Sequence, residues 1–502
     1  MDVQLDRDSS VPLYLQLCQS IRGMILDGRL PEGFRLPPER TLAQALRVNR
    51  TTVLNAYREL KAEGLLGAHV GRGTAVLPRR FPEKEPAAPD SLPWGQLMRE
   101  AGAGVSDPLL RDLLELTERR DVISLAVGLP APELMPLGDL GRLMGKLLEE
   151  EGASALLHSP TEGVSTFREV LSGLMTARGI RCQPSEAMVT SGSQQSLDLL
   201  ARVFLEPGDS VVVEEPSYFG ALRVFTAAGA RLIGVPADQQ GMRTDLLEAL
   251  LERHRPKLIY TLPTFQNPSG VVMSLGRRGH LLELSRRFRI PIVEDDPYSE
   301  LRYEGEALPS LKALDQTGHV IYLCSFSKVL FPGLRIGWLA ASRPVLRRLV
   351  LVKQAVDLHS TTLGQMLVER FIREGLYQRH VRAVRAEYTR RRDAMEEALR
   401  ASAPPELSWA KPKGGFYFWC TFPSGVSQAQ LMARAGQASV AYLPGEACFV
   451  NQPPENHFRL NFTYAAPAQA REGITRLMRA LREACAQPFR EERATEATTP
   501  LV

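Results

Sequence analysis

Apolar residues recur at helical spacing through the first eighty residues of this 502-residue chain. The spacing predicts three helices, within 13–28, 36–47 and 50–64. The residues expected to face inward are Leu13, Leu17, Ile21, Met24, Ile25, Leu42, Ala45, Leu46, Val53, Tyr57 and Leu60. Two short apolar runs then flank a turn at 71–73 and predict a β-hairpin. Three helices followed by a hairpin make a winged helix.

Small polar residues open the third predicted helix. This composition suits the N-terminal end of a helix in a DNA major groove, where arginine forks onto guanine and threonine meets a phosphate or a thymine methyl group. Arginines on the second helix and the hairpin are expected to contact the DNA backbone or the minor groove and to add salt-sensitive affinity. Each arginine alone is better explained as a solvated surface charge, but their joint placement on the expected elements favours DNA. The candidate contacts are Arg40, Asn49, Arg50, Thr51, Thr52 and Arg72.

Residues 11–78 resemble the DNA-binding domain of GntR-type bacterial regulators. The shared letters run from PLY at the start, through RLP and LA before the third helix, to GRGT in the hairpin. One departure is Pro38-Glu39, where the family often has two serines, and we expect it to affect the start of the second helix more than base readout. Charge agrees with a nucleic-acid partner, because residues 1–80 hold 12 basic and 8 acidic residues while the remainder is balanced.

The segment 81–112 is rich in proline and charge and lacks apolar periodicity, so it is predicted to be a connector. We therefore expect a DNA-binding domain at 1–80, a second domain at 113–487 and a disordered tail at 488–502. The six cysteines have no metal-ligand spacing, which indicates free thiols and no metal site. Neither a signal-peptide pattern nor a bilayer-length apolar run is visible, so a cytoplasmic protein is expected.

From about residue 120, continuous apolar runs alternate with amphipathic helical segments. Such runs, bounded by turns, are typical of buried parallel strands in a helix-covered sheet. The fold class is thus a multidomain chain, with a winged helix-turn-helix followed by an α/β domain. Ligands of these sheets bind beyond the carboxyl ends of the strands.

Polar residues follow several of the predicted strands. Ser193 and Gln194 open a helix whose free amides can hold a phosphate, although serine there is also an ordinary cap. Tyr218 can stack on a flat ring or pack in the core, and Asn267 can donate to a phenolic oxygen or form a turn. Asp295 belongs to a run of three acids at a strand end, and a carboxylate paired with a protonated ring nitrogen explains that run better than packing does.

Lys328 stands among apolar residues, where an ammonium group is costly. A lysine that forms an imine with an aldehyde must lose its proton, which burial and a nearby cation favour. Arg335 can fork onto a phosphate, and Ser325 and Ser327 add hydroxyl donors. Aldehyde, pyridine ring, phenol and phosphate together describe pyridoxal 5′-phosphate (PLP).

Residues 120–487 resemble the fold-type-I aminotransferases, with a smaller C-terminal α+β subdomain. The resemblance implies that Lys328 is the Schiff-base lysine, that Asp295 is the pyridinium partner and that Arg459 binds a substrate carboxylate. It also implies a homodimer, with His158 where the family usually has a tyrosine that reaches the partner subunit's phosphate. The remaining cofactor contacts that it implies are Tyr298 and Asn267 at the ring oxygen, Tyr218 on the ring, and Ser193, Gln194, Ser325 and Arg335 at the phosphate.

A GntR-like domain ahead of an aminotransferase-like domain resembles the MocR/GabR-type transcriptional regulators. That resemblance implies a PLP-dependent regulator that binds operator DNA and responds to PLP or an amino compound. Two alternatives stay open: an active α-amino-acid aminotransferase with an accessory DNA-binding domain, and a PLP sensor without an amino substrate. Arg459 argues against the pure sensor, which needs no carboxylate clamp.

Overall fold

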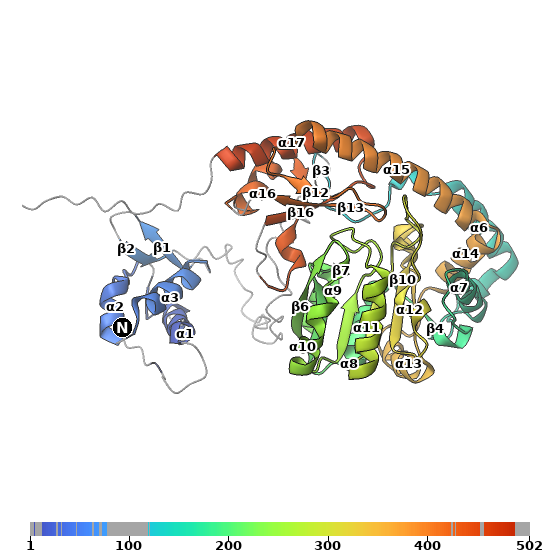
Figure 1. Ribbon diagram of the computed structural model, residues 1–502, viewed down its shortest axis with the longest axis horizontal. Helices are drawn as coiled ribbons and strands as arrows, with labels where there is room; N and C mark the ends of the chain where they lie inside the picture. The colour runs from blue at the N-terminus through green and yellow to red at the C-terminus, as the bar shows by residue number, and fades with distance from the viewer. Residues whose placement is uncertain are drawn as a thin grey trace, which may run out of the picture. The chain divides into compact units, whose positions relative to one another are not determined.

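The computed structural model forms two compact units, Met1–Arg99 and Glu100–Val502, which are described separately (Figure 1). The residues that the structure describes are 5, 13–26, 29–31, 33–46, 48–62, 65–69, 73–77, 119, 121–422, 425–426, 428–451 and 456–486. The predicted connector at 81–112 and the predicted tail at 488–502 lie outside them. None of the helices in these stretches is both long enough and apolar enough to cross a lipid bilayer.

The first unit is a winged helix, as the sequence predicts. Its strands pair antiparallel, from Leu66 opposite Val76 to His69 opposite Gly73. Its elements are α1 (Leu13–Leu26), α2 (Glu39–Leu46), α3 (Arg50–Ala62), β1 (Leu66–His69) and β2 (Gly73–Val76).

The core of the first unit joins all three helices. Leu17, Ile21, Val53 and Leu60 are fully buried in one cluster, which confirms the periodicity of α1 and α3. The prediction for α2 is partly wrong, because Ala43 is buried while Ala45 is exposed. In α2 the second buried residue is therefore two positions earlier than expected, and Leu46, which was also expected to face inward, is only half-buried.

The second unit is built on an eight-stranded sheet in the order β4-β11-β10-β9-β8-β5-β6-β7 (Figure 1). Neighbouring strands from β10 to β6 pair in parallel, while β11 and β7 run antiparallel to their neighbours. The strands are β4 (Ala187–Thr190), β5 (Ser210–Glu215), β6 (Arg231–Asp238), β7 (Gly241–Met242), β8 (Leu258–Thr261), β9 (Ile292–Asp295), β10 (Val320–Ser325) and β11 (Gly337–Ala340).

Helices bury both faces of this sheet, which explains why its strands read as continuous apolar runs. Val211 and Val213 enter one hydrophobic cluster while Val212 between them enters the other. The helices of this part are α8 (Ser193–Phe204), α9 (Phe219–Ala227), α10 (Thr244–His254), α11 (Leu275–Phe288), α12 (Leu311–Leu314) and α13 (Arg343–Asp357).

A smaller, antiparallel sheet in the order β12-β13-β16-β15 completes the unit. Its strands are β12 (Ser408–Trp409), β13 (Tyr417–Phe422), β15 (Leu443–Pro444) and β16 (Asn456–Asn461), and β3 (Ile123–Ser124) pairs separately with β14 (Val440–Ala441). The remaining helices are α6 (Leu137–Glu151), α7 (Ser165–Ala177), α14 (Thr362–Arg373), α15 (Leu376–Ser402), α16 (Gln428–Gln437) and α17 (Pro467–Ala486). The predicted α/β domain with a mainly parallel sheet and a smaller α+β part is therefore confirmed.

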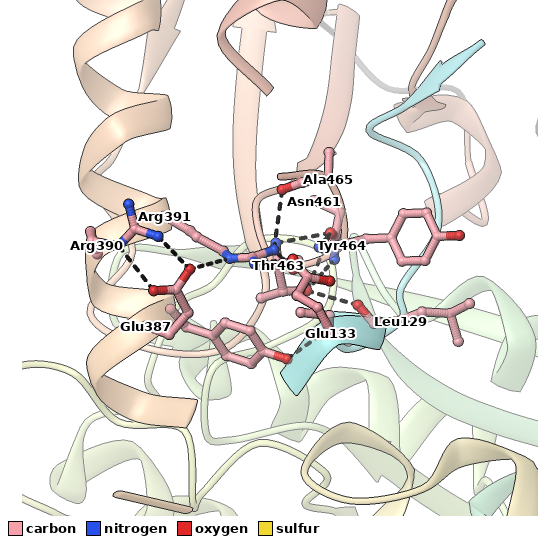
Figure 2. Close-up of polar contacts among 11 residues, drawn as sticks. Leu129, Glu133, Glu387, Arg390, Arg391, Asn461, Thr463, Tyr464 and Ala465 are labelled. Carbon is pink, nitrogen blue, oxygen red and sulfur yellow. Dashed lines mark hydrogen bonds and ion pairs between the residues drawn. The ribbon is translucent and has the colours of Figure 1, made fainter. Parts of the chain in front are cut away.

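Arg391 in α15 holds the loop after β16 in place (Figure 2). Its guanidinium donates to the carbonyl oxygens of Thr463 at 2.8 Å and Ala465 at 3.3 Å, and to Glu387 Oε1 at 2.7 Å. Glu133 also pairs with it, and only 4 % of the Arg391 side chain is exposed. One buried cation thus ties the long helix to the loop that follows the Arg459 strand.

We predict that Arg391→Ala lowers the free energy of unfolding of the second unit by about 2–3 kcal/mol, because two buried carbonyl acceptors and the half-buried Glu387 carboxylate lose a charged donor. Arg390 is the matched control: it pairs with the same Glu387, but its side chain is 63 % exposed. Arg390→Ala should leave the free energy of unfolding nearly unchanged, because exposed ion pairs contribute little to stability. Guanidinium denaturation followed by tryptophan fluorescence measures both, and equal effects would contradict the anchoring role.

Candidate functional site

A cavity of about 250 Å³ opens where the parallel strands of the large sheet end. Five strands deliver side chains to it from their last residue or from within three residues after it: β4, β5, β8, β9 and β10. The sequence-predicted residues that line it are Ser193, Gln194, Tyr218, Asn267, Asp295, Tyr298, Ser325, Ser327, Lys328, Arg335 and Arg459. Residues that lie more than two hundred positions apart therefore meet in one place.

Lys328 follows β10 at the end of a single 3₁₀ turn, and it points into the cavity. Its Nζ donates to the carbonyl oxygen of Gly128 at 2.6 Å. Ser325 stabilises the turn, because its Oγ accepts from the Ser327 amide at 3.1 Å. Burial lowers the pKa of Lys328, and the charges of Arg459 and Arg335 act in the same direction, while Tyr417 and Asp295 oppose it. The lysine is thus biased toward the neutral amine that an imine requires.

Asp295 is the last residue of β9 and is 2 % exposed. Its Oδ2 accepts from the Tyr260 hydroxyl at 2.9 Å, while its buried Oδ1 has no hydrogen-bond partner among the described residues. Burial raises the pKa of Asp295 to about 7, with Tyr260 and Lys328 opposing the shift. A buried oxygen without a partner beside a cavity is the place where a protonated ring nitrogen fits.

The start of α8 offers an anion site. Ser193 Oγ is buried without a partner in the described part of the chain, and Gly192 has a φ of +90°, which favours glycine. Arg335 lies across from it, with Nη2 donating to the Ser191 carbonyl oxygen at 3.0 Å. A Cβ on Gly192 would lie 2.6 Å from Arg335 Nη2, so a larger residue here would displace the guanidinium. These groups can hold a phosphate.

Arg459 on β16 reaches the cavity from the small sheet. It donates to Asn267 Oδ1 at 2.8 Å and to the Ala126 carbonyl oxygen at 2.7 Å, and its buried Nε has no partner within the described ranges. Its guanidinium lies 4.0 Å from the ring centroid of Tyr417. The Asn267 oxygen is therefore occupied, and its amide group remains available to donate.

Two tyrosines line the cavity. Tyr298 is buried and donates to the Tyr417 hydroxyl at 3.1 Å, and burial raises the pKa of Tyr298 well above its usual value. Tyr218 donates to Gln194 Oε1 at 3.3 Å, and burial raises the pKa of Tyr218 to about 12. Both phenols therefore stay protonated and act as hydrogen-bond donors.

His158 does not reach this cavity. It lies on the surface, where its Nδ1 is 2.7 Å from Nε2 of His359. The predicted phosphate contact of His158 belongs to a second subunit, and it stays a prediction.

The candidate DNA contacts lie on the expected elements of the first unit, except for Arg72, which lies outside the described residues. Arg40, Asn49, Arg50 and Thr51 are exposed and Thr52 is half-buried. Asn49 also caps α3, because its Oδ1 accepts from the Thr51 amide at 2.9 Å.

Glu39 has a second role besides starting α2: its Oε2 accepts a hydrogen bond from the Arg50 guanidinium at 3.4 Å. The departure at Pro38-Glu39 therefore touches the arginine that is predicted to read a base, which the sequence interpretation did not foresee.

Sequence reasoning missed three residues that contact the polar side chains of the candidate site: Gly128, Tyr260 and Tyr417. Gly128 acts through its carbonyl oxygen, which no side-chain motif announces. Tyr260 lies inside β8 and reads as core, although its hydroxyl orients Asp295. Tyr417 lies in the aromatic run 416–419, where packing is the usual explanation.

Comparison with known proteins assigns each unit to a family. Residues 120–477 match the family described as aminotransferase class I and II, and residues 13–76 match the bacterial regulatory proteins of the gntR family. The HTH-type transcriptional regulator YisV of Bacillus subtilis is 33 % identical, over 94 % of this chain and 96 % of its own. The probable rhizopine catabolism regulatory protein MocR of Rhizobium meliloti is 31 % identical, over 94 % of each chain.

An aminotransferase of known structure matches the second unit alone. The α-aminoadipate aminotransferase LysN of Thermus thermophilus, solved with N-(5′-phosphopyridoxyl)-L-leucine, is 38 % identical. The match covers 79 % of this chain and 100 % of LysN, with a TM-score of 0.74.

The raised pKa of Asp295 predicts a pH dependence of stability in the cofactor-free protein. Because the folded pKa, about 7, exceeds the ordinary 3.8, the stability that Asp295 contributes is present below pH 4 and is lost as pH rises toward 7. Asp295→Asn removes that loss. Urea denaturation at several pH values should show the variant gaining stability relative to wild type between pH 4 and 7. A difference that is constant over this interval would mean that Asp295 titrates normally.

Proposed function

Because the chain belongs to the aminotransferase class I and II family and joins that domain to a GntR-family DNA-binding domain, as in MocR-like regulators, we propose that it is a PLP-dependent transcriptional regulator. One observation carries this proposal. The chain holds both units, and it matches two transcriptional regulators over more than nine-tenths of its length, so the match includes both units in the same order. The effector is PLP itself or a small amino compound with a carboxylate.

The residues of the cavity fit PLP. Bound there, PLP supplies an electrophilic aldehyde to Lys328 and an electron-withdrawing ring. Asp295 would hold the ring nitrogen through its unpartnered Oδ1, and the raised pKa of Asp295 would fall beside that cation. Asn267 would donate to the ring oxygen, and Tyr298 would do so by turning its single hydroxyl proton from Tyr417 to the cofactor. The phosphate would lie among Ser193, Gln194, Ser325, Ser327 and Arg335, and the ring would lie against Tyr218.

Two further side chains of the cavity would act on the effector. Lys328 would take up and release a proton at Nζ, which its lowered pKa makes easier. Arg459 binds the effector's carboxylate, and its unpartnered Nε is available without breaking an existing hydrogen bond. Tyr417 packs on the guanidinium and fixes its plane. An amino acid is therefore a better effector than an amine without a carboxylate.

We propose that the second unit forms a homodimer. Leu156, Leu157 and Leu358 have exposed fractions of 67 %, 63 % and 55 %. The contact between His158 and His359 brings these chain segments together into one apolar patch. Monomeric proteins rarely expose such patches, and a second copy covers this one in the proposal. It lies beside His158, the residue that is expected to reach the partner's phosphate.

The partner of the first unit is double-stranded operator DNA, and we propose a cytoplasmic location because bacterial DNA lies there. The exposed start of α3 would enter the major groove, with Arg50 as the base-reading residue. Arg50 must exchange the Glu39 carboxylate for the DNA, which is possible because its side chain is 70 % exposed. Arg40 and Arg72 would add phosphate contacts.

Active transamination is the second candidate function. It is favoured by a specific observation: the second unit is 38 % identical to a whole aminotransferase, whereas the two regulators are 33 % and 31 % identical over the longer match. Every residue type that the chemistry needs lines the cavity. The two functions differ in outcome, because a regulator must change its DNA affinity with the effector while an enzyme need only turn over.

We predict that Arg50→Ala weakens operator binding by about 1–3 kcal/mol, the usual value of a bidentate arginine–guanine contact. Binding to an unrelated duplex should fall much less, because only phosphate contacts are used there. Gel-shift titrations on both duplexes measure the difference. An Arg50→Ala variant that loses affinity for both duplexes equally would show that Arg50 contacts the backbone instead.

Effector and operator must be coupled through Lys328 if the protein is a regulator. Wild type should absorb in the visible range with PLP, and candidate amino acids should change both this band and operator affinity. Lys328→Ala should lose the band and the amino-acid effect while its affinity for operator without effector is unchanged. Arg459→Ala should need much more amino acid for the same effect, because an unpaired carboxylate then enters the site. Operator titrations with and without amino acid measure this.

Three outcomes separate the candidates. Operator affinity that changes with the amino acid only when Lys328 is present supports the regulator. Constant operator affinity together with steady turnover supports the aminotransferase and contradicts the regulator. An effect of PLP alone, with no response to amino acids, indicates a pure PLP sensor.

A further inference from the structure

A second cavity, of about 540 Å³, lies in the same unit. It is bounded by the end of α7, the segment 296–310 and the first turns of α15. None of the residues that line it lines the first cavity. It is therefore a separate space with room for a small molecule.

The two cavities share one wall, the segment that follows β9. Asp295, Pro297 and Tyr298 line the first cavity, whereas Asp296, Ser299 and Glu300 line the second. A ligand in the second cavity would thus contact the residues that directly follow Asp295 and Tyr298 in the chain.

The second cavity has a surplus of positive charge. Four arginines line it against two acids, Asp296 and Glu300, and both acids already have partners. Glu300 Oε1 accepts from Arg178 at 2.7 Å, and its Oε2 accepts from Arg385 at 3.2 Å. Asp296 Oδ2 accepts from the Tyr322 hydroxyl at 2.7 Å. Arg302 and Arg382 are the arginines that remain.

Neither of these two arginines makes a side-chain hydrogen bond or ion pair within the described part of the chain. Arg302 lies on the ring of Phe265, 4.6 Å from its centroid, and its buried Nε has no acceptor there. Arg382 is exposed at the cavity edge. Ser299 Oγ is a further buried polar atom without a partner among the described residues. Burial lowers the pKa of Arg302, and the charges of Arg278 and Arg385 add to this, while Asp296 opposes it; a further anion beside Arg302 would act in the same direction as Asp296.

We propose that the second cavity binds a small dianionic metabolite, with Arg302, Arg382 and Ser299 as its donors. A guanidinium fork and a hydroxyl match either a phosphate or a pair of carboxylates. Because the ligand would sit behind the segment that carries Asp295, its binding is linked to the binding of PLP in the first cavity. The site goes beyond the proposed effector site and stands independently of it.

The test uses the full chain saturated with PLP, so that the first cavity is filled, and titrates it calorimetrically with succinate and with inorganic phosphate. At least one of them should bind once per chain. Succinate alone would identify a dicarboxylate ligand, and phosphate alone a phosphorylated one. Arg382→Ala should weaken binding about tenfold, the usual effect of losing one charged hydrogen bond. Arg302→Gln should weaken it at least as much.

Arg479→Ala is the matched control, because it removes an exposed arginine on α17 that lines neither cavity. Since Arg302 is packed on Phe265, Arg302→Gln is interpreted only if its melting temperature equals that of wild type; Arg382→Ala carries the test otherwise. Unchanged binding in Arg382→Ala, equal weakening in Arg479→Ala, or binding of neither probe would each overturn the proposal.

Linkage gives an independent readout. The anion should change the affinity for PLP, and PLP should change the affinity for the anion by the same factor. An anion that competes with PLP for one site would overturn the proposal. If the protein does not bind PLP at all, the proposed function fails, but titration of the cofactor-free chain with its Arg382→Ala variant still decides the anion site.

Discussion

Desolvation is the constraint on which the rest of the candidate site depends. Asp295 and Lys328 are held in one cavity, and burial moves both toward their neutral forms. Neither shift is typical of a structural ion pair, in which two opposite charges would favour each other's ionised form. The cofactor-free site therefore stores unfavourable electrostatics, which a ligand with a ring cation and an aldehyde relieves at both ends. Such storage is common where a protein must bind one particular chemistry.

The arrangement that makes this possible is the parallel sheet itself. Strands β4, β5, β8, β9 and β10 all end at one edge, so each contributes a side chain without any long loop. The small sheet adds Arg459 from the other side, and Arg391 fixes the loop after that strand to α15 (Figure 2). Rigid elements thus set the positions of the polar groups around the cavity.

Much of this was visible in the sequence, for identifiable reasons. Polar side chains at the ends of apolar strands differ clearly from their neighbours in the sequence, and this contrast identifies Lys328, Asp295 and Asn267 as candidates. Gly128 acts through its backbone carbonyl oxygen, and every residue has one, so the residue type gives no signal. Tyr260 lies within an apolar strand, where a tyrosine is usually explained by packing of its ring in the core. In α2, eight residues define the buried face too weakly to choose between Ala43 and Ala45. The contact between Glu39 and Arg50 joins two helices, and no local pattern contains it.

That contact has a consequence for how ionic strength acts on the DNA-binding domain. Salt screens an exposed ion pair as well as the attraction of arginine to phosphate. As salt rises, the Glu39 carboxylate holds Arg50 less firmly, so releasing the arginine to the duplex costs less. The two effects oppose each other. The measured slope of affinity against salt concentration therefore underestimates the number of phosphates that the domain contacts. The Glu39 carboxylate acts as a built-in counterion of Arg50, which stays attached to the protein when DNA binds.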